Sequence, residues 1–251
     1  MIQDWSKIQA KSQTAVILGS GPSINDIDTN EWAHLKYACD SWAINNWVYH
    51  PTFIPNFYMI ETKWYGYDIL VRRFIEKQTS YSDVKFLFQR NKQIKMRDGS
   101  LRYIRNVVWR DAERFEFDVV SRDSKRTSRI TDANYSYHPN ALTKSYDCSM
   151  THLLELVDRV GYKRIVLYGV DLSNSFYFWS DGDPKYGEVH HLTNKAHENK
   201  PPTDPHNTAL IYDFIVDFRR RLNYNGCELL VGSKRSALYP DLPLIKWEYQ
   251  Q

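Results

Sequence analysis

Cysteine is scarce in this chain of 251 residues, which contains only Cys39, Cys148 and Cys227. An odd number of widely spaced cysteines does not indicate a disulfide framework, and their spacing matches no familiar zinc site. We therefore expect three reduced, buried thiols in a reducing compartment. No metal is expected to be bound through cysteine.

Long apolar runs and an excess of charge of one sign are also lacking. No stretch approaches the roughly 20 apolar residues that cross a bilayer, and the amino terminus, MIQDWSKIQAKSQ, has no apolar core of a signal peptide. With 33 Lys and Arg against 30 Asp and Glu, the net charge of +3 is too small to predict nucleic-acid binding. We expect a cytoplasmic protein with no nucleic-acid partner. Two further properties stay open: peripheral attachment to the inner face of the membrane, and assembly into a homo-oligomer.

Aromatic residues are in excess, at 15% of the chain. Aromatic rings bury large areas in a core, and they also stack on flat ligands and sugar rings. In the middle of the chain, Tyr103 and Trp109 therefore have two readings, as a platform for an acceptor glycan or as core residues, of which core packing is favoured.

Apolar runs alternate with helical patterns along the chain. Strands are expected at residues 14–18, 37–45, 56–61, 84–88, 164–168 and 227–231, and helices at 65–79, 149–160 and 207–222. This order predicts a single α/β domain over residues 1–251, with a Rossmann-like, mostly parallel sheet and helices on both faces. Residues 89–138 show no clear period. Residues 173–206 have little apolar pattern, and a loop of that length is an active-site lid or a disordered segment; we expect a lid.

The five residues after the first strand, Gly19-Ser20-Gly21-Pro22-Ser23, form a glycine turn. Glycine allows the backbone to approach a ligand closely, and Ser23 adds a hydroxyl where free backbone N–H groups favour an anion. The turn is no Walker loop, because no Gly-Lys-Ser/Thr follows, and no dinucleotide motif, because Ile24 occupies the third glycine position. We expect it to bind a phosphate, and a purely structural turn is the alternative.

Polar residues follow three other expected strands. Asn45 and Asn46 come after the second strand, Glu61 ends the third, and Gly169-Val170-Asp171 follows residues 164–168. Side-chain amides can read a nucleotide base or ribose, and Asp171 can accept from ribose hydroxyls or cap the next turn. In a parallel sheet the carboxyl ends of the strands meet at one edge, so we expect these residues to line one ligand site.

These motifs resemble those of the bacterial sialyltransferases of glycosyltransferase family 42. The residues that carry the likeness are GSGPS at 19–23, INN at 44–46, Ser149 at the head of a helix, and GYKRIVLYGVD at 161–171. The family shows G-N-G-P-S, C-N-Q, T-S-G and G-Y-K-x-I-x-L-x-G-I-D at similar spacing. The likeness is firm over residues 14–46 and 149–172. Transferases of the sugar acid Kdo and archaeal-type pterin diphosphokinases share the opening turn.

The resemblance implies the sialyltransferase-like variant of the GT-A fold and transfer of a sialic-acid-like or Kdo-like sugar acid from a CMP-activated donor. The acceptor would be a glycan or a lipid-linked glycan, in polysaccharide biosynthesis, and neither a metal nor another cofactor is implied. The donor-binding positions carried over are Gly19, Ser20, Gly21, Pro22, Ser23, Asn45, Asn46, Ser149, Gly169 and Asp171.

The same resemblance implies catalytic roles for His206, Tyr177 and Glu61. His206, ahead of the last long helix, matches the family's general base, with His191 as second choice, and Tyr177 matches one of two tyrosines that hold the leaving phosphate. Ser173 stands near the position of the other tyrosine. Glu61 stands where the family has an asparagine touching the donor, and it would repel a sugar carboxylate unless it is protonated or turned away. In a retaining course, Glu61 or Asp171 would serve as nucleophile.

Three other readings stay open. Asp181-Gly182-Asp183 is a D-x-D pattern that holds Mn²⁺ or Mg²⁺ in other glycosyltransferases, although an ordinary turn is favoured. A 6-hydroxymethylpterin diphosphokinase would combine these aspartates with Lys234 and Arg235 to transfer diphosphate from ATP. A nucleotide-binding module without catalysis is the third.

Overall fold

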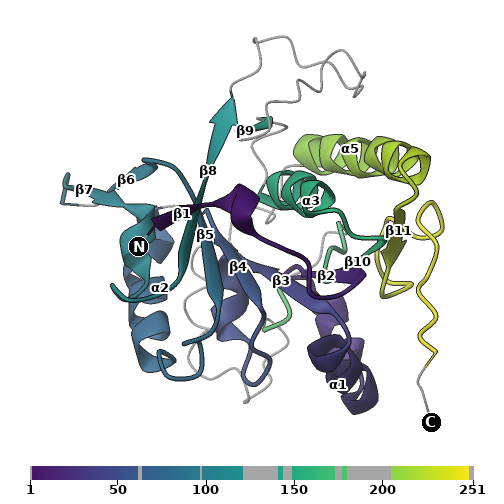
Figure 1. Cartoon of the computed structure of the whole chain (residues 1–251), viewed down its shortest axis with the longest axis horizontal. Helices are drawn as coiled ribbons and strands as arrows, with labels where there is room; N and C mark the ends of the chain where they lie inside the picture. Colours follow the sequence, from purple (N-terminus) through teal and green to yellow (C-terminus); the bar gives the residue numbers. More distant parts are fainter. Residues whose placement is uncertain are drawn as a thin grey trace.

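The computed structural model describes residues 2–61, 64–96, 98–120, 141–143, 149–172, 177–179 and 205–248. A parallel sheet forms its centre (Figure 1). The strand order is β1 (Ile2–Asp4), β8 (Arg114–Val120), β5 (Lys85–Gln89), β4 (Phe57–Ile60), β3 (Asp40–Ile44), β2 (Thr14–Leu18), β10 (Arg164–Tyr168) and β11 (Glu228–Val231), and β9 (Ala141–Thr143) pairs with β8. Outside the sheet, β6 (Gln93–Lys95) and β7 (Leu101–Tyr103) form an antiparallel hairpin.

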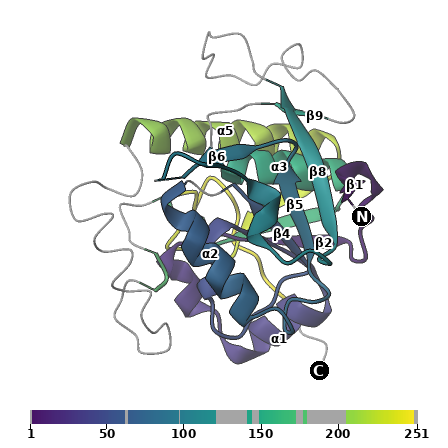
Figure 2. The ribbon, with the colours of Figure 1, turned by 90° about the vertical axis from the view of Figure 1, so that its left-hand side faces the viewer.

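Helices cover both faces of this sheet, which confirms the expected α/β architecture (Figures 1 and 2). On one face lie α3 (Ser149–Val160) and α5 (Pro205–Tyr224), and on the other lie α1 (Thr29–Tyr37) and α2 (Trp64–Glu76). Four short 3-10 helices complete the described elements: η1 (Trp5–Lys7), η2 (Pro22–Asp26), η3 (Asn45–Tyr49) and η4 (Ile104–Val107).

The helix α3 forms where its apolar spacing predicts it. Leu153, Leu154 and Val157 are fully buried in the core that α3 shares with α5 and the sheet. The helix stops at Gly161, which adopts a left-handed φ of +90°, a conformation that glycine reaches without strain. After two further residues β10 begins at Arg164, and its pairing with β2 and β11 fixes where its carboxyl end lies.

The aromatic excess largely serves the core on the α1 and α2 side of the sheet. Trp47, Tyr58, Phe86 and Trp179 are fully buried there. Trp109 packs against the same core, with its ring centroid 5.5 Å from that of Phe86, which supports the core reading of this residue.

Two of the three cysteines lie in the described residues and fit the expectation of buried thiols. Cys39 and Cys227 are free and buried. Burial raises the pKa of each thiol to about 12, so both stay protonated near neutral pH.

The expected strand over residues 37–45 begins too early. Tyr37 is the last residue of α1, whose first turn is capped by the Asp28 carboxylate accepting from the Glu31 N–H at 2.8 Å, and β3 begins only at Asp40. Apart from Tyr37, the helix α1 lies where the sequence pattern predicts no element.

The unplaced region 89–138 contains the long strand β8. Its sequence, RFEFDVV, alternates charged and apolar residues, which is the period of a strand, so this part of the region does have a pattern. The structure compensates one of these charges, because Glu116 accepts from Arg105 at 3.0 Å and lies 3.6 Å from Arg90.

Most of the expected lid lies outside the described residues. Of residues 173–206, the structure describes only 177–179 and 205–206, the latter as the start of α5. In the described part of the chain, none of the helices combines the length and apolarity that crossing a bilayer requires.

Candidate functional site

The predicted site residues follow strands that end at one edge of the sheet. Leu18, the last residue of β2, pairs with Tyr168, the last of β10, and on its other side with Ala43 of β3. From β2 the chain moves outward through β3, β4 and β5, and later it returns to place β10 on the opposite side of β2. The carboxyl ends of the neighbouring strands β2 and β10 therefore form the topological switch point, where open α/β sheets bind their ligands.

At this switch point the glycine turn packs directly onto the turn that follows β10. The Gly19 N–H donates to the Tyr168 carbonyl and the Gly21 N–H to the Gly169 carbonyl, each at 2.7 Å. A Cβ atom on Gly19 would lie 2.4 Å from the Gly169 oxygen, and one on Gly21 would lie 2.4 Å from Asp171 Oδ2. Contact between two backbone turns therefore requires these glycines, whether or not a ligand binds.

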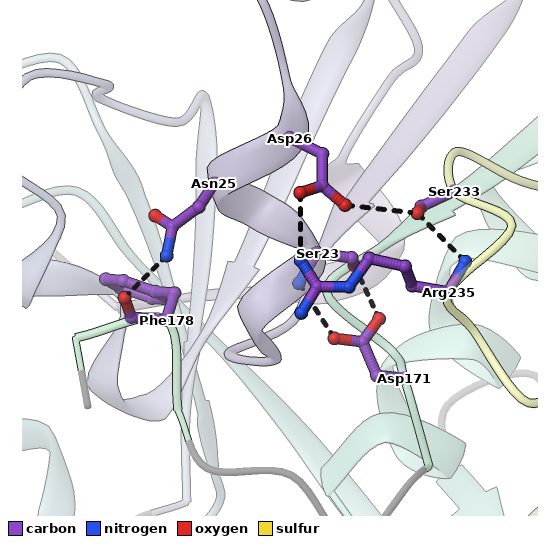
Figure 3. A network of polar contacts seen from close by, with 7 residues as sticks. All are labelled: Ser23, Asn25, Asp26, Asp171, Phe178, Ser233 and Arg235. Carbon is purple, nitrogen blue, oxygen red and sulfur yellow. Dashed lines mark hydrogen bonds and ion pairs between the residues drawn. The ribbon is translucent and has the colours of Figure 1, made fainter. Parts of the chain in front are cut away.

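Ser23 and Asp171 join the two turns in the interior (Figure 3). The Ser23 N–H donates to Asp171 Oδ2 at 2.9 Å, and the Ser23 hydroxyl donates to Asp171 Oδ1 at 2.5 Å. Both residues are at least nine-tenths buried. In this structure Asp171 therefore accepts from both the backbone N–H and the hydroxyl of Ser23. The roles of Ser23 and Asp171 in donor binding stay predictions.

Two further groups of residues lie around the glycine turn: an exposed ion pair, and Phe178 from the part of the expected lid that the structure describes (Figure 3). Arg235 Nη1 pairs with Asp26 Oδ1 at 2.9 Å, and both side chains are exposed. On another side, the Phe178 N–H donates to the Ser20 carbonyl, and Asn25 Nδ2 donates to the Phe178 carbonyl, each at 2.9 Å. The neighbouring Tyr177 is half-buried and stacks on Trp179 with 4.4 Å between ring centroids. Tyr177 is thus anchored close to the glycine turn.

A second polar group, the Asn45 cluster, consists of Asn45, Glu61, Ser149 and His152. Asn45 follows β3 with a left-handed φ of +46°, its Oδ1 accepts from the Glu61 N–H at 2.8 Å, and its Nδ2 donates to Ser149 Oγ at 3.0 Å. The carboxylate of Glu61 lies 3.1 and 3.2 Å from His152 Nδ1. The structure thus brings together three residues that the sequence assigns to donor binding and catalysis.

The buried Tyr58 hydroxyl holds the backbone of Asn45. Its hydroxyl donates to the Asn45 carbonyl at 2.6 Å and accepts from the Val48 N–H at 2.7 Å. Burial raises the pKa of Tyr58 well above its usual value, so the hydroxyl stays protonated and keeps the strained Asn45 in place.

His152 is a residue of the site that the apolar spacing of α3 does not point to. It lies one turn after Ser149 and therefore on the same side of the helix. This spacing was the available signal, but its importance depends on Glu61, which is 91 residues away in the sequence.

Of the other predicted site residues, some are described by the structure and some are not. Pro22 is buried at the start of η2, and Ser20 and Asn46 are half-buried at the same edge of the sheet. His206 lies in the first turn of α5, but its side chain, like His191 and the D-x-D pattern, falls outside the described residues. Within the part of the chain that is described, no three His, Cys, Asp or Glu side chains come together as a metal site. Metal independence stays a prediction.

Comparisons with known proteins place the chain near sialyltransferases of solved structure. Two variants of the sialyltransferase CstII in complex with CMP are 15% and 14% identical to the chain, each with a TM-score of 0.48. Both matches cover 92% of this chain, and they cover 85% of the first variant's chain and 86% of the second's. CstII from Campylobacter jejuni in complex with the substrate analogue cytidine-5'-monophosphate is 14% identical, with a TM-score of 0.46, and covers 92% of this chain and 84% of its own. No protein-family model and no curated protein sequence matches the chain.

Proposed function

We propose that the chain is a glycosyltransferase that moves a sialic-acid-like or Kdo-like sugar acid from a CMP-activated donor to an acceptor glycan, without a metal. One observation carries this proposal. Asn45, Glu61 and Ser149 come from three separate motifs, and they meet in one hydrogen-bonded cluster at the carboxyl edge of the sheet. That edge, beside the switch point, is where the ligand of such a sheet binds.

The chemistry of the transfer matches these groups. When the bond between the anomeric carbon and CMP breaks, positive charge develops on the sugar and negative charge on the phosphate, so the site must offer N–H and O–H donors. Asn46, Ser20 and Tyr177 are half-buried polar residues at this edge and are suited to that task. In the proposed reaction the acceptor oxygen bonds to the anomeric carbon, CMP leaves with the electron pair, and His206 takes the hydroxyl proton.

A thermal-shift screen with CMP, CDP, UDP, ATP and GDP, each with and without Mg²⁺, tests the donor assignment. We expect CMP to raise the melting temperature without Mg²⁺, because a ligand at 100 times its Kd stabilises the native state by about 2.7 kcal/mol. A shift by ATP that requires Mg²⁺ would instead identify a diphosphokinase. CMP binding without transfer to any acceptor would indicate a binding module.

The variant His206→Ala tests the base. We expect turnover to fall by about 10²–10⁴-fold, the usual contribution of general base catalysis, while the CMP-induced thermal shift stays as in the wild type. Ser149→Ala is the matched comparison, since loss of this hydroxyl should weaken CMP binding. Equal turnover of His206→Ala and wild type would remove His206 from the mechanism.

A further inference from the structure

Glu61 and His152 form an interior pair within the Asn45 cluster. Both carboxylate oxygens of Glu61 lie within 3.2 Å of His152 Nδ1, the Glu61 side chain is 14% exposed, and His152 is 5% exposed. A carboxylate so far removed from water is costly unless an opposite charge or a hydrogen-bond donor compensates it. Among the described residues, the His152 ring is the group that does so.

The other ring nitrogen of His152 has no hydrogen-bond partner among the residues that the structure describes. This atom, Nε2, is buried. Because Nδ1 faces Glu61, Nε2 lies on the ring edge directed away from it. A buried polar atom without a partner loses its hydrogen bond to water and gains none in return, so such an atom calls for a missing partner. The Asn45 side-chain amide, in contrast, is hydrogen-bonded through both its oxygen and its nitrogen.

The surroundings of Nε2 belong to the proposed donor site. Ser149 and His152 lie one turn apart on the same side of α3, and Asn45 links Ser149 to the backbone of Glu61. A lone carboxylate here would repel the phosphate and the carboxylate of a CMP-linked sugar acid. In the structure the Glu61 carboxylate faces His152. A protonated His152 would neutralise this carboxylate and so remove its repulsion of the donor's anionic groups.

We propose that Glu61 and His152 form an ion pair that makes this edge of the sheet an anion subsite. Glu61 holds the imidazolium, and the Nε2–H donates to an anionic oxygen of the donor substrate, either its phosphate or its sugar carboxylate. Glu61 then acts as a positioning residue and not as a nucleophile. This inference rests on the proposed function, and it adds a donor-binding residue and a reason for the carboxylate beside it.

Calorimetric titration of three variants tests the pair. His152→Gln leaves Glu61 uncompensated, and we expect CMP-N-acetylneuraminate, which carries both the phosphate and the sugar carboxylate, to bind about 10- to 100-fold more weakly, the range of a hydrogen bond to a charged group. The double variant Glu61→Gln/His152→Gln removes both charges and should recover much of that loss, and Glu61→Gln alone should weaken binding of the same compound less than His152→Gln. A double variant that binds no better than His152→Gln would overturn the ion pair.

Further probes identify the anionic group. If the phosphate is bound, His152→Gln should weaken CMP binding and leave cytidine binding unchanged. If the sugar carboxylate is bound, the loss should appear with CMP-N-acetylneuraminate and not with its methyl ester. An equal loss for all four probes contradicts an anion subsite. His34→Gln is the matched control, because His34 lies on α1, against Trp247, on the opposite side of the sheet.

The free protein gives an independent measurement. Long-range ¹H–¹⁵N spectra, with His152→Gln for assignment, should show protons on both ring nitrogens of His152 at pH 7 and loss of that state in Glu61→Gln. A neutral His152 ring would overturn the inference whatever the protein binds. If the ring is charged but the wild type binds none of the cytidine compounds, the proposed function fails and the ion pair stands.

Discussion

Gly19→Ala is expected to destabilise the protein by about 3 kcal/mol or more, as severe overpacking does. The new Cβ would lie 2.4 Å from the carbonyl oxygen and 2.8 Å from the carbonyl carbon of Gly169. Both are backbone atoms of the turn after β10, so no side-chain rotation can relieve the contact, and the two central strands would have to separate. Urea unfolding at equilibrium measures the loss as a lower midpoint.

Gly161→Ala is the matched control for this variant. Gly161 has a φ of +90°, and apart from its chain neighbours no atom of the described residues lies within 4 Å of the position of a Cβ, so alanine there meets strain but no collision. We expect a loss of about 1–2 kcal/mol from the left-handed conformation alone. If Gly19→Ala costs no more than Gly161→Ala, the two turns are not packed as tightly as described.

Asp171→Ala should have the second large effect on stability. Its removal leaves the buried N–H and hydroxyl of Ser23 without their acceptors, and each unpaired buried group costs about 1–3 kcal/mol. Ser23→Ala should cost less, because it removes the hydroxyl while the backbone N–H keeps its bond to Asp171. Urea unfolding of both variants gives the order. Equal midpoints for Asp171→Ala and wild type would contradict a stabilising role of the two hydrogen bonds between Ser23 and Asp171.

The Ser23→Ala variant also separates the structural role of Ser23 from its predicted role in donor binding. If Ser23 only joins the two turns, a folded Ser23→Ala should bind CMP as well as the wild type does. If it also contacts the donor, CMP affinity should fall by more than the loss of stability explains. The structure makes this comparison necessary, because Asp171 already takes both donors of Ser23.

Local pattern was enough to locate several elements. Thr14–Leu18, Ser149–Val160 and Arg164–Tyr168 have the bounds that the sequence predicts, because an unbroken apolar run or a helical apolar spacing, ended by glycine, leaves few alternatives. In β8, Phe115 and Phe117 alternate with Glu116 and Asp118, which is the period of a strand, so the interpretation of residues 89–138 as aperiodic is wrong for this element. Local pattern does not show which arginines compensate these charges.

By itself, the sequence determined that this protein is an α/β protein with polar residues after its strands, since strand and helix periods and the motif positions are local properties of the chain. Only the tertiary structure decided how those residues are used. Ser23 and Asp171 are 148 residues apart, and Glu61 and His152 are 91 residues apart. Both pairs form because the strand order places β10 beside β2, and α3 against β3. Such partnerships depend on topology and register, and no local pattern encodes them.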